Sequence, residues 1–150
     1  MKFNRVLIVI GMATLFHSAF PQQKVEISQV MGNLYVIITG YHSMKGKIRI
    51  ALYHSEHDYQ SAAKPLQADS INIIQNRSVV VFENLVPGDY AVKVYHDENN
   101  DGKLNTNFIG KPTEGYGFSN NVRGTFGPAS WSAAKFKFTA ATDSIRIELK

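Results

Sequence analysis

The chain has 150 residues, of which 44% are hydrophobic and 19% are charged. These values are typical of one ordinary globular domain, and they exclude a long disordered chain. The formal net charge is +4, but no run of basic residues alternates with aromatic residues, so we expect no nucleic-acid partner. The chain has no cysteine, which excludes thiol catalysis, disulfides and cysteine-ligated zinc. Stability must therefore come from packing or from a bound metal ion.

The first twenty residues have the pattern of a secretory signal peptide. Two basic residues precede an apolar run at 6–16, and the small residues Ser18 and Ala19 follow it. The run is shorter than the roughly 20 apolar residues that span a bilayer. We predict a signal peptide at 1–20, a short lead at 21–29 and export to the periplasm or the extracellular space. Once the signal is removed, the protein would not be integral to a membrane. An uncleaved anchor and a buried terminal strand are the alternatives, because the residue three positions before the expected cut is not small.

From residue 30 onward, short segments of alternating polar and apolar residues follow one another. Residues 33–40, for example, place Leu34, Val36 and Ile38 on one face, which is the period of a β-strand. The further segments of this kind are 46–54, 71–74, 78–85, 89–96, 133–140 and 143–150. About seven strands with turn residues between them predict an all-β fold: a single antiparallel Greek-key β-sandwich over residues 30–150, of the transthyretin or immunoglobulin type.

Three local features refine this prediction. We expect a helical turn or two only at 55–65, which ends at Pro65. The Pro87-Gly88 pair predicts a tight turn between two strands, in which proline sets φ and glycine takes a positive φ. Trp131, the only tryptophan, is expected to begin the next strand and to lie in the core or anchor a loop.

A long motif follows the Pro87-Gly88 turn. The run "GDYAVKVYHDENNDGKLNTNFIGKPTEGYGFSNN" at 88–121 is preceded by "GKIRIALY" and followed by "FGPASWSAAKFKF". Together these segments resemble the DUF2141 family of exported bacterial proteins, and the strands around the turn are similar to transthyretin-like and carboxypeptidase-regulatory-like sandwiches. The resemblance covers nearly all of residues 30–150, with Asn105 in place of a usual aspartate. It implies a β-sandwich outside the cytoplasm and no assigned biochemical role.

The first half of this motif contains a candidate calcium site. Its Asp-x-Asn-x-Asp-Gly pattern matches the first half of a calcium loop, in which alternate side chains turn inward and glycine allows the bend. The oxygen ligands would come from Asp97, Asn99, Asp101, Lys103 through its main-chain carbonyl, Asn105, and Glu114 from across the turn. A true EF-hand is not expected, because Phe108 occupies the twelfth position, where that loop needs a bidentate glutamate.

Two interpretations of the acidic loop stay open. Oxygen ligands alone favour Ca²⁺, and an incompletely closed site would bind it weakly, with a Kd on the order of 10⁻⁴ to 10⁻³ M. Such an affinity suits an environment outside cells, where calcium is abundant. Alternatively, the Asp, Asn and Gly residues only build turns, with side chains that cap the backbone in Asx turns.

The second half of the motif, 113–121, contains a candidate ligand-binding surface. Its glycines allow close approach of a backbone, and its aromatic and amide side chains suit a sugar or a peptide. The candidate residues are Tyr116, Phe118, Asn120 and Asn121. The alternative is a loop that folds back and packs its aromatic residues over the edge of the sandwich.

No nucleophile elbow or other catalytic context is present in the sequence. We therefore predict a non-catalytic exported module whose acidic loop binds a structural Ca²⁺ ion. The alternative is a domain that binds a small molecule, a glycan or a peptide through residues 113–121, with a glycan or another cell-surface molecule as partner. Neither the ligand nor the oligomeric state follows from the sequence.

Overall fold

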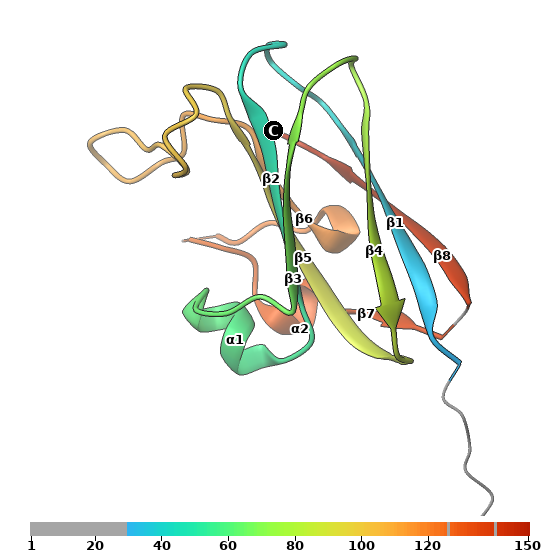
Figure 1. Ribbon diagram of the computed structural model, residues 1–150. Coiled ribbons are helices and arrows are strands. Elements are labelled where there is room, and N and C mark those ends of the chain that lie inside the picture. Colours follow the sequence, from blue (N-terminus) through green and yellow to red (C-terminus); the bar gives the residue numbers. More distant parts are fainter. Residues whose placement is uncertain (1–29, 126, 140) are drawn as a thin grey trace, which may run out of the picture.

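The computed structural model describes residues 30–125, 127–139 and 141–150. The predicted signal peptide and lead lie outside these residues. Two β-sheets pack face to face (Figure 1), so the predicted all-β sandwich is confirmed. None of the helices in the described part of the chain combines the length and the apolar character that crossing a membrane requires.

The described residues form eight strands and three short helical segments. The strands are β1 (Gly32–Thr39), β2 (Lys47–Tyr53), β3 (Gln67–Asn72), β4 (Ser78–Leu85), β5 (Gly88–Asp97), β6 (Tyr116–Phe118), β7 (Phe136–Phe138) and β8 (Thr142–Glu148). The helical segments are α1 (Glu56–Ser61), the 3-10 turn η1 (Ser119–Asn121) and α2 (Trp131–Ala134). One sheet has the order β4-β1-β8, and the other has the order β3-β2-β5-β6 with β7 also paired to β5.

The core lies between the two sheets and is built from the alternating residues of their inner faces. Leu34, Val36 and Ile38 of β1 are fully buried, as their spacing predicts. The corresponding positions of the other strands, together with the residue that follows β8, complete one cluster: Ile48, Ile50, Leu52, Val80, Phe82, Leu85, Tyr90, Val92, Val94, Phe138, Ile147 and Leu149. With no cysteine in the chain, burial of this apolar surface is the main source of stability.

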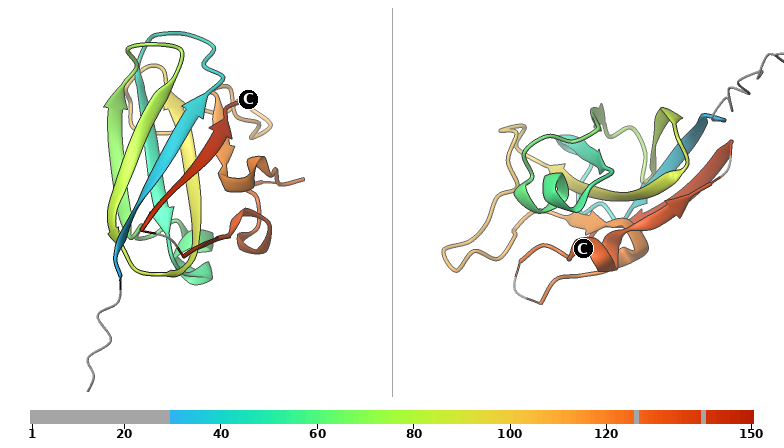
Figure 2. Two further views of the ribbon diagram at one scale, coloured as in Figure 1. Left: turned by 90° about the vertical axis from the view of Figure 1, so that its right-hand side faces the viewer. Right: turned by 90° about the horizontal axis from the view of Figure 1, so that it is seen from below.

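A second apolar cluster covers the outer face of the larger sheet at one end, beneath α1 and α2. Tyr59 of α1 and Trp131 of α2 pack edge to face, with ring centroids 5.7 Å apart, over Tyr53, Ala91 and Phe118. Figure 2 shows both helices at this end of the sandwich. The helical turn predicted at 55–65 is confirmed, and Trp131 is buried as predicted, although it begins a helix rather than a strand.

The pairing of the strands departs from the prediction in two places. β8 runs parallel to β1, so the smaller sheet is mixed rather than purely antiparallel. The strands on either side of Pro87-Gly88 belong to different sheets, so the turn is not a hairpin. The predicted positive φ at Gly88 is also wrong: Gly88 does not have a positive φ, and it already pairs with Phe138 in β5. The positive φ lies instead at Asn84 (φ 58°), before the chain crosses between the sheets.

Three strand boundaries also differ from the sequence pattern. β3 begins at Gln67, before the segment predicted at 71–74, and β7 is confined to Phe136–Phe138 because α2 occupies the residues before it. β6 lies at Tyr116–Phe118, inside the motif that was predicted to bind a ligand. It pairs with β5 and extends the larger sheet on the side where the acidic loop leaves it.

Candidate functional site

The acidic loop joins β5 to β6 and projects from one end of the larger sheet (Figure 1). Its outer part is a small hairpin closed by a bridge between Thr106 and Pro112. Asn107 organises the tip, because its side-chain oxygen accepts the amide N–H groups of Ile109 (3.1 Å) and Lys111 (3.0 Å). The loop is therefore an ordered structure with its own hydrogen bonds.

Asp97, the last residue of β5, is fully buried and holds the base of the loop. Its Oδ1 accepts the amide N–H of Asp101 at 3.1 Å, and its Oδ2 accepts that of Gly102 at 3.0 Å. The Arg49 Nε donates to the same Oδ2 at 2.5 Å. Burial opposes ionisation of Asp97, but Arg49 and the amide N–H of Gly102 outweigh it, so the Asp97 pKa lies below its ordinary value.

Asp101 is exposed and is surrounded by hydrogen-bond donors of the loop. Its Oδ2 accepts the side-chain amides of Asn105 (3.0 Å) and Asn99 (3.1 Å), and its Oδ1 accepts the amide N–H of Lys103 (2.8 Å). The Asn105 amide contributes most to lowering the pKa of Asp101 below its ordinary value. Three of the predicted calcium ligands, Asn99, Asp101 and Asn105, are thus in contact with one another through the Asp101 carboxylate.

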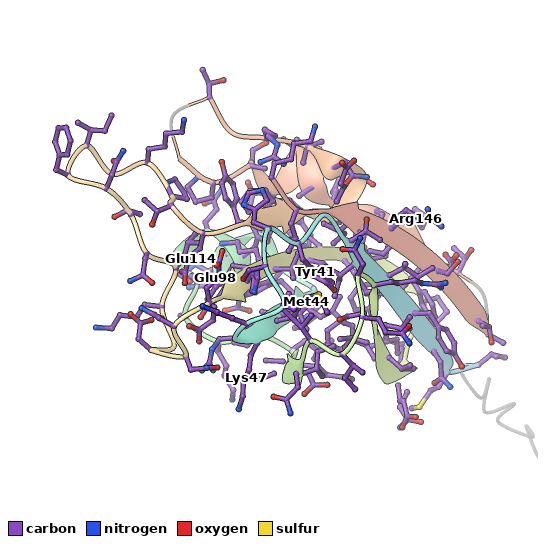
Figure 3. The ribbon with its side chains drawn as sticks, turned by 90° about the horizontal axis from the view of Figure 1, so that it is seen from above. Tyr41, Met44, Lys47, Glu98, Glu114 and Arg146 are labelled. Atoms are coloured by element: carbon purple, nitrogen blue, oxygen red, sulfur yellow. The ribbon has the colours of Figure 1, made fainter. Side chains whose placement is uncertain are left out.

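Glu114 reaches back from the far side of the loop and closes it. Its Oε1 accepts the amide N–H of Glu98 at 2.9 Å, and its Oε2 accepts that of Asn105 at 2.8 Å. The residue is only 7% exposed, and Figure 3 shows Glu98 and Glu114 close together at the base of the loop. The two halves of the motif therefore form one structure, joined by a carboxylate that binds backbone N–H groups.

The chemistry of the loop fits a cation only in part. Within the described ranges, no three His, Cys, Asp or Glu side chains gather closely enough to hold a metal ion. A cation at Asp101 would depend on amide and main-chain oxygens as well. The amide nitrogens of Asn99 and Asn105 now face Asp101, and rotation of the Asn105 amide would present its oxygen to an ion instead.

Arg49 is a member of the site that sequence reasoning missed. Its guanidinium pairs with Asp97, whose hydrogen bond raises the Arg49 pKa. Arg49 lies opposite Tyr95 in the pairing of β2 with β5, and the Tyr95 hydroxyl donates to the carbonyl of Gly102 at 2.9 Å. The alternating charges of β2 were visible in the sequence, but which strand lies beside β2 was not.

His96 lies beneath the loop and is fully buried. Its Nε2 is 2.6 Å from the carbonyl oxygen of Lys45, and a carbonyl only accepts, so this nitrogen carries a proton. Its Nδ1 has no hydrogen-bond partner among the described residues and lies 3.8 Å from Oε1 of Glu98. The Ser43 hydroxyl donates to the other oxygen of Glu98 at 2.9 Å.

The predicted ligand-binding residues divide into two groups. Tyr116 is half-buried and borders a hollow of about 440 Å³ whose wall also includes Lys111, Glu114 and Arg123. The Arg123 guanidinium lies over the Tyr116 ring, 5.1 Å from its centroid. Phe118 is 6% exposed and belongs to the cluster beneath α1 and α2.

Asn120 and Asn121 use their amides to hold the structure together. The Asn120 Nδ2 donates to the carbonyl oxygens of Ala133, Ala134 and Lys135, at the end of α2. Asn121 donates to the Arg146 carbonyl at 3.1 Å and accepts the Glu148 N–H at 2.8 Å, and so pairs with the free edge of β8.

The chain was compared with protein families, curated proteins and solved structures. The chain matches the model of the family described as "Uncharacterized protein conserved in bacteria (DUF2141)" over residues 36–146. No curated protein and no solved structure matches the chain. The matched region begins in β1, ends in β8 and contains the acidic loop and the segment from Tyr116 to Asn121. The chain therefore belongs to the DUF2141 family.

Proposed function

We propose that the protein is an exported, non-catalytic β-sandwich module whose acidic loop binds Ca²⁺ as a structural ion. The observation that supports this proposal is the convergence of Asn99 and Asn105 on the carboxylate of Asp101. Gly102 follows Asp101 with a φ of 82°, the conformation that the sharp bend of a calcium loop requires.

In this proposal the loop residues divide into ligands and supports. The oxygens for the ion would come from Asn99, Asp101, Asn105 and the carbonyl of Lys103. Asp97 and Glu114 act as supports, since both carboxylate oxygens of each accept backbone N–H groups. The same division supports a non-catalytic role, because the buried carboxylates of Asp97 and Glu114 are engaged in holding the loop.

A thermal melt with and without Ca²⁺ tests the proposal. At about ten times its Kd, Ca²⁺ would add about 1.4 kcal/mol to the free energy of unfolding, which raises the Tm by roughly 5 °C for a domain of this size. Asp101→Asn should abolish the rise. Asp101 suits this test better than Asp97, because Asp97 also pairs with the guanidinium of Arg49.

Asp69→Asn is the matched control, since Asp69 is an exposed aspartate on β3, outside the loop. It should retain the response to Ca²⁺. An equal rise in wild type and Asp101→Asn, or an equal rise with Na⁺ at the same ionic strength, would remove the calcium site and leave the loop as a set of Asx turns.

A second candidate function is the binding of a small molecule or a glycan beside Tyr116. The hollow of about 440 Å³ at this residue supports it, because ligand sites are concave and partly aromatic. Tyr116→Ala should weaken binding in a glycan screen, whereas Asn120→Ala should mainly lower the Tm. Retention of all glycan binding by Tyr116→Ala would exclude this hollow.

A further inference from the structure

The tip of the acidic loop exposes two large apolar side chains. Phe108 is 98% exposed and Ile109 is 71% exposed. The hairpin that carries them is ordered by the bridge between Thr106 and Pro112 and by the hydrogen bonds of Asn107. An aromatic and an aliphatic residue held in water on a preformed projection indicate a surface that is covered when the protein works.

Two cationic side chains without ion pairs, Lys111 and Arg123, line the hollow beside Tyr116. Lys111 belongs to the hairpin and lies two residues after Ile109 in the chain. In the described part of the chain, neither cation has a carboxylate within the 4.0 Å of a salt bridge. Glu114 borders the same hollow, but both of its oxygens accept backbone N–H groups.

A second hollow connects Lys111 to the apolar tip. It measures about 480 Å³, and its wall includes Ile109, Leu104 and Phe118. The two hollows share Lys111, Pro112 and Tyr116. An apolar surface that continues into a cationic one is complementary to an anionic phospholipid, in which the acyl chains lie next to a negatively charged phosphate.

We propose that the hairpin from Leu104 to Pro112 docks the protein onto the surface of an anionic phospholipid bilayer. Phe108 and Ile109 enter the boundary between headgroups and acyl chains, while Lys111 and Arg123 contact lipid phosphates. Small apolar insertions combined with electrostatic attraction give reversible binding of this kind. The inference is independent of calcium binding by the loop.

The shape of the tip favours a bilayer over a protein partner. A stable protein interface buries about 800 Å² on each side, whereas here two side chains stand on a narrow projection. A bilayer needs no matching pocket and accepts a convex tip. A second copy of the chain is the main competing occupant, and the experiment distinguishes it.

The test is sedimentation of the exported, processed protein with vesicles in the presence of EDTA. The vesicles are phosphatidylcholine with or without phosphatidylglycerol. We expect binding to the anionic vesicles, and we expect Phe108→Ser with Ile109→Ser to weaken it by about tenfold or more, because the inserted apolar area is lost. All variants carry the same N-terminus, so the differences between them report the loop.

Two further variants separate the apolar and the electrostatic contributions. Lys111→Gln with Arg123→Gln should weaken binding to anionic vesicles and reduce its dependence on salt. Ile74→Ser is the matched control, because Ile74 is 84% exposed in the turn between β3 and β4, outside the loop. It should bind like wild type. Unchanged thermal melts of the variants show that they fold.

A fluorescent reporter shows whether the tip enters the bilayer. The native Trp131 is buried, so a tryptophan introduced by Phe108→Trp reports the tip, and its emission should shift to the blue with anionic vesicles. The proposal fails if no shift occurs. It also fails if free glycerol phosphate, which has no acyl chains, displaces the protein completely from the vesicles, because binding would then depend on the phosphate contact alone. It also fails if the tip variants bind vesicles like wild type but lose a dimer seen by analytical ultracentrifugation.

Discussion

At the scale of single residues, the carboxylates of the acidic loop perform different tasks because they have different surroundings. Asp97 is buried and bound to Arg49 and two amide groups, so its charge is needed to fold the loop. Asp101 is exposed and accepts two side-chain amides. Only Asp101 can exchange its partners for an ion without breaking the base of the loop, which is why the calcium test uses it.

A glycine behind the loop gives a prediction at this scale. Gly46 has a φ of 76°, and a Cβ there would lie 2.0 Å from the carbonyl oxygen of Asp97. Gly46→Ala should lower the free energy of unfolding by about 2 to 4 kcal/mol. Alanine is strained at this positive φ, and its Cβ would also force the backbone of Asp97 to move. Urea denaturation measures the change.

The control for Gly46→Ala is Gly110→Ala. Gly110 has a similar φ of 80°, but a Cβ there would meet nothing within 4 Å. Its substitution should lower the free energy of unfolding by about 1 kcal/mol, the conformational term alone. Equal losses for the two variants would mean that contact with Asp97 contributes nothing.

At the scale of elements, the segment from Ser119 to Asn121 fills the gap that β6 and β7 leave along β5 in the larger sheet. β6 pairs with residues 93–95 of β5, and β7 pairs with residues 88–90. Between them, the buried Ser119 hydroxyl accepts the amide N–H of Val92 at 2.9 Å and donates to the carbonyl of Ala134 at 2.6 Å. This part of the family motif is therefore explained by the assembly of β5, α2 and β8.

The gap gives a prediction for the element. Ser119→Ala removes both hydrogen bonds and leaves the buried N–H of Val92 without a partner, which should lower the free energy of unfolding by about 1 to 3 kcal/mol. Ser144→Ala, at an exposed position of β8, should change it by less than about 0.5 kcal/mol. A near-neutral Ser119→Ala would show that water replaces the hydroxyl.

At the scale of the whole molecule, the two sheets enclose one core, and each strand either has neighbours on both sides or lies at an edge of its sheet. β1 lies between β4 and β8, and β5 lies between β2 and the short strands β6 and β7. β3 and β4 lie at the edges of their sheets. Because the chain has no disulfides, the pairing and packing of these strands carry the stability of the sandwich.

Amide hydrogen exchange should reveal this arrangement. We expect the amides of β1 and β5 to exchange slowest, near the rate of global unfolding, and those of β3 to exchange roughly tenfold faster or more. The measurement is native-state exchange followed by mass spectrometry. Equal protection of β3 and β1 would indicate that another surface, such as that of a second chain, covers the edge.

Much of the fold could be predicted because strand alternation is a local property. The inward residues of β1, β2 and β5 follow from a period of two, and the turn of helix at α1 follows from its position before Pro65. β6 was missed because its three residues, among glycines, carry no alternation. Gly88 was misassigned because a local turn pattern does not say whether the next strand pairs in the same sheet.

For the candidate site, the sequence predicted which residues belong to the loop but not the contacts that they make. The spacing of Asp97, Asn99, Asp101 and Gly102 identifies the loop, and Glu114 was predicted to supply an oxygen from across the turn. Its contacts with N–H groups, however, depend on where the backbone of Glu98 and Asn105 lies. The partnership of Arg49 with Asp97 depends on which strand lies beside β2.

The all-β class, the inward-facing residues of the strands and the position of the acidic loop can be read from the amino-acid sequence, because each depends on the spacing of residues close together in the chain. The three-dimensional arrangement was needed to show that β8 runs parallel to β1, that Arg49 pairs with Asp97, and that Phe108 is exposed. These are contacts between segments that are distant in the chain, or outcomes of burial, and they depend on how the strands pair and how the two sheets pack.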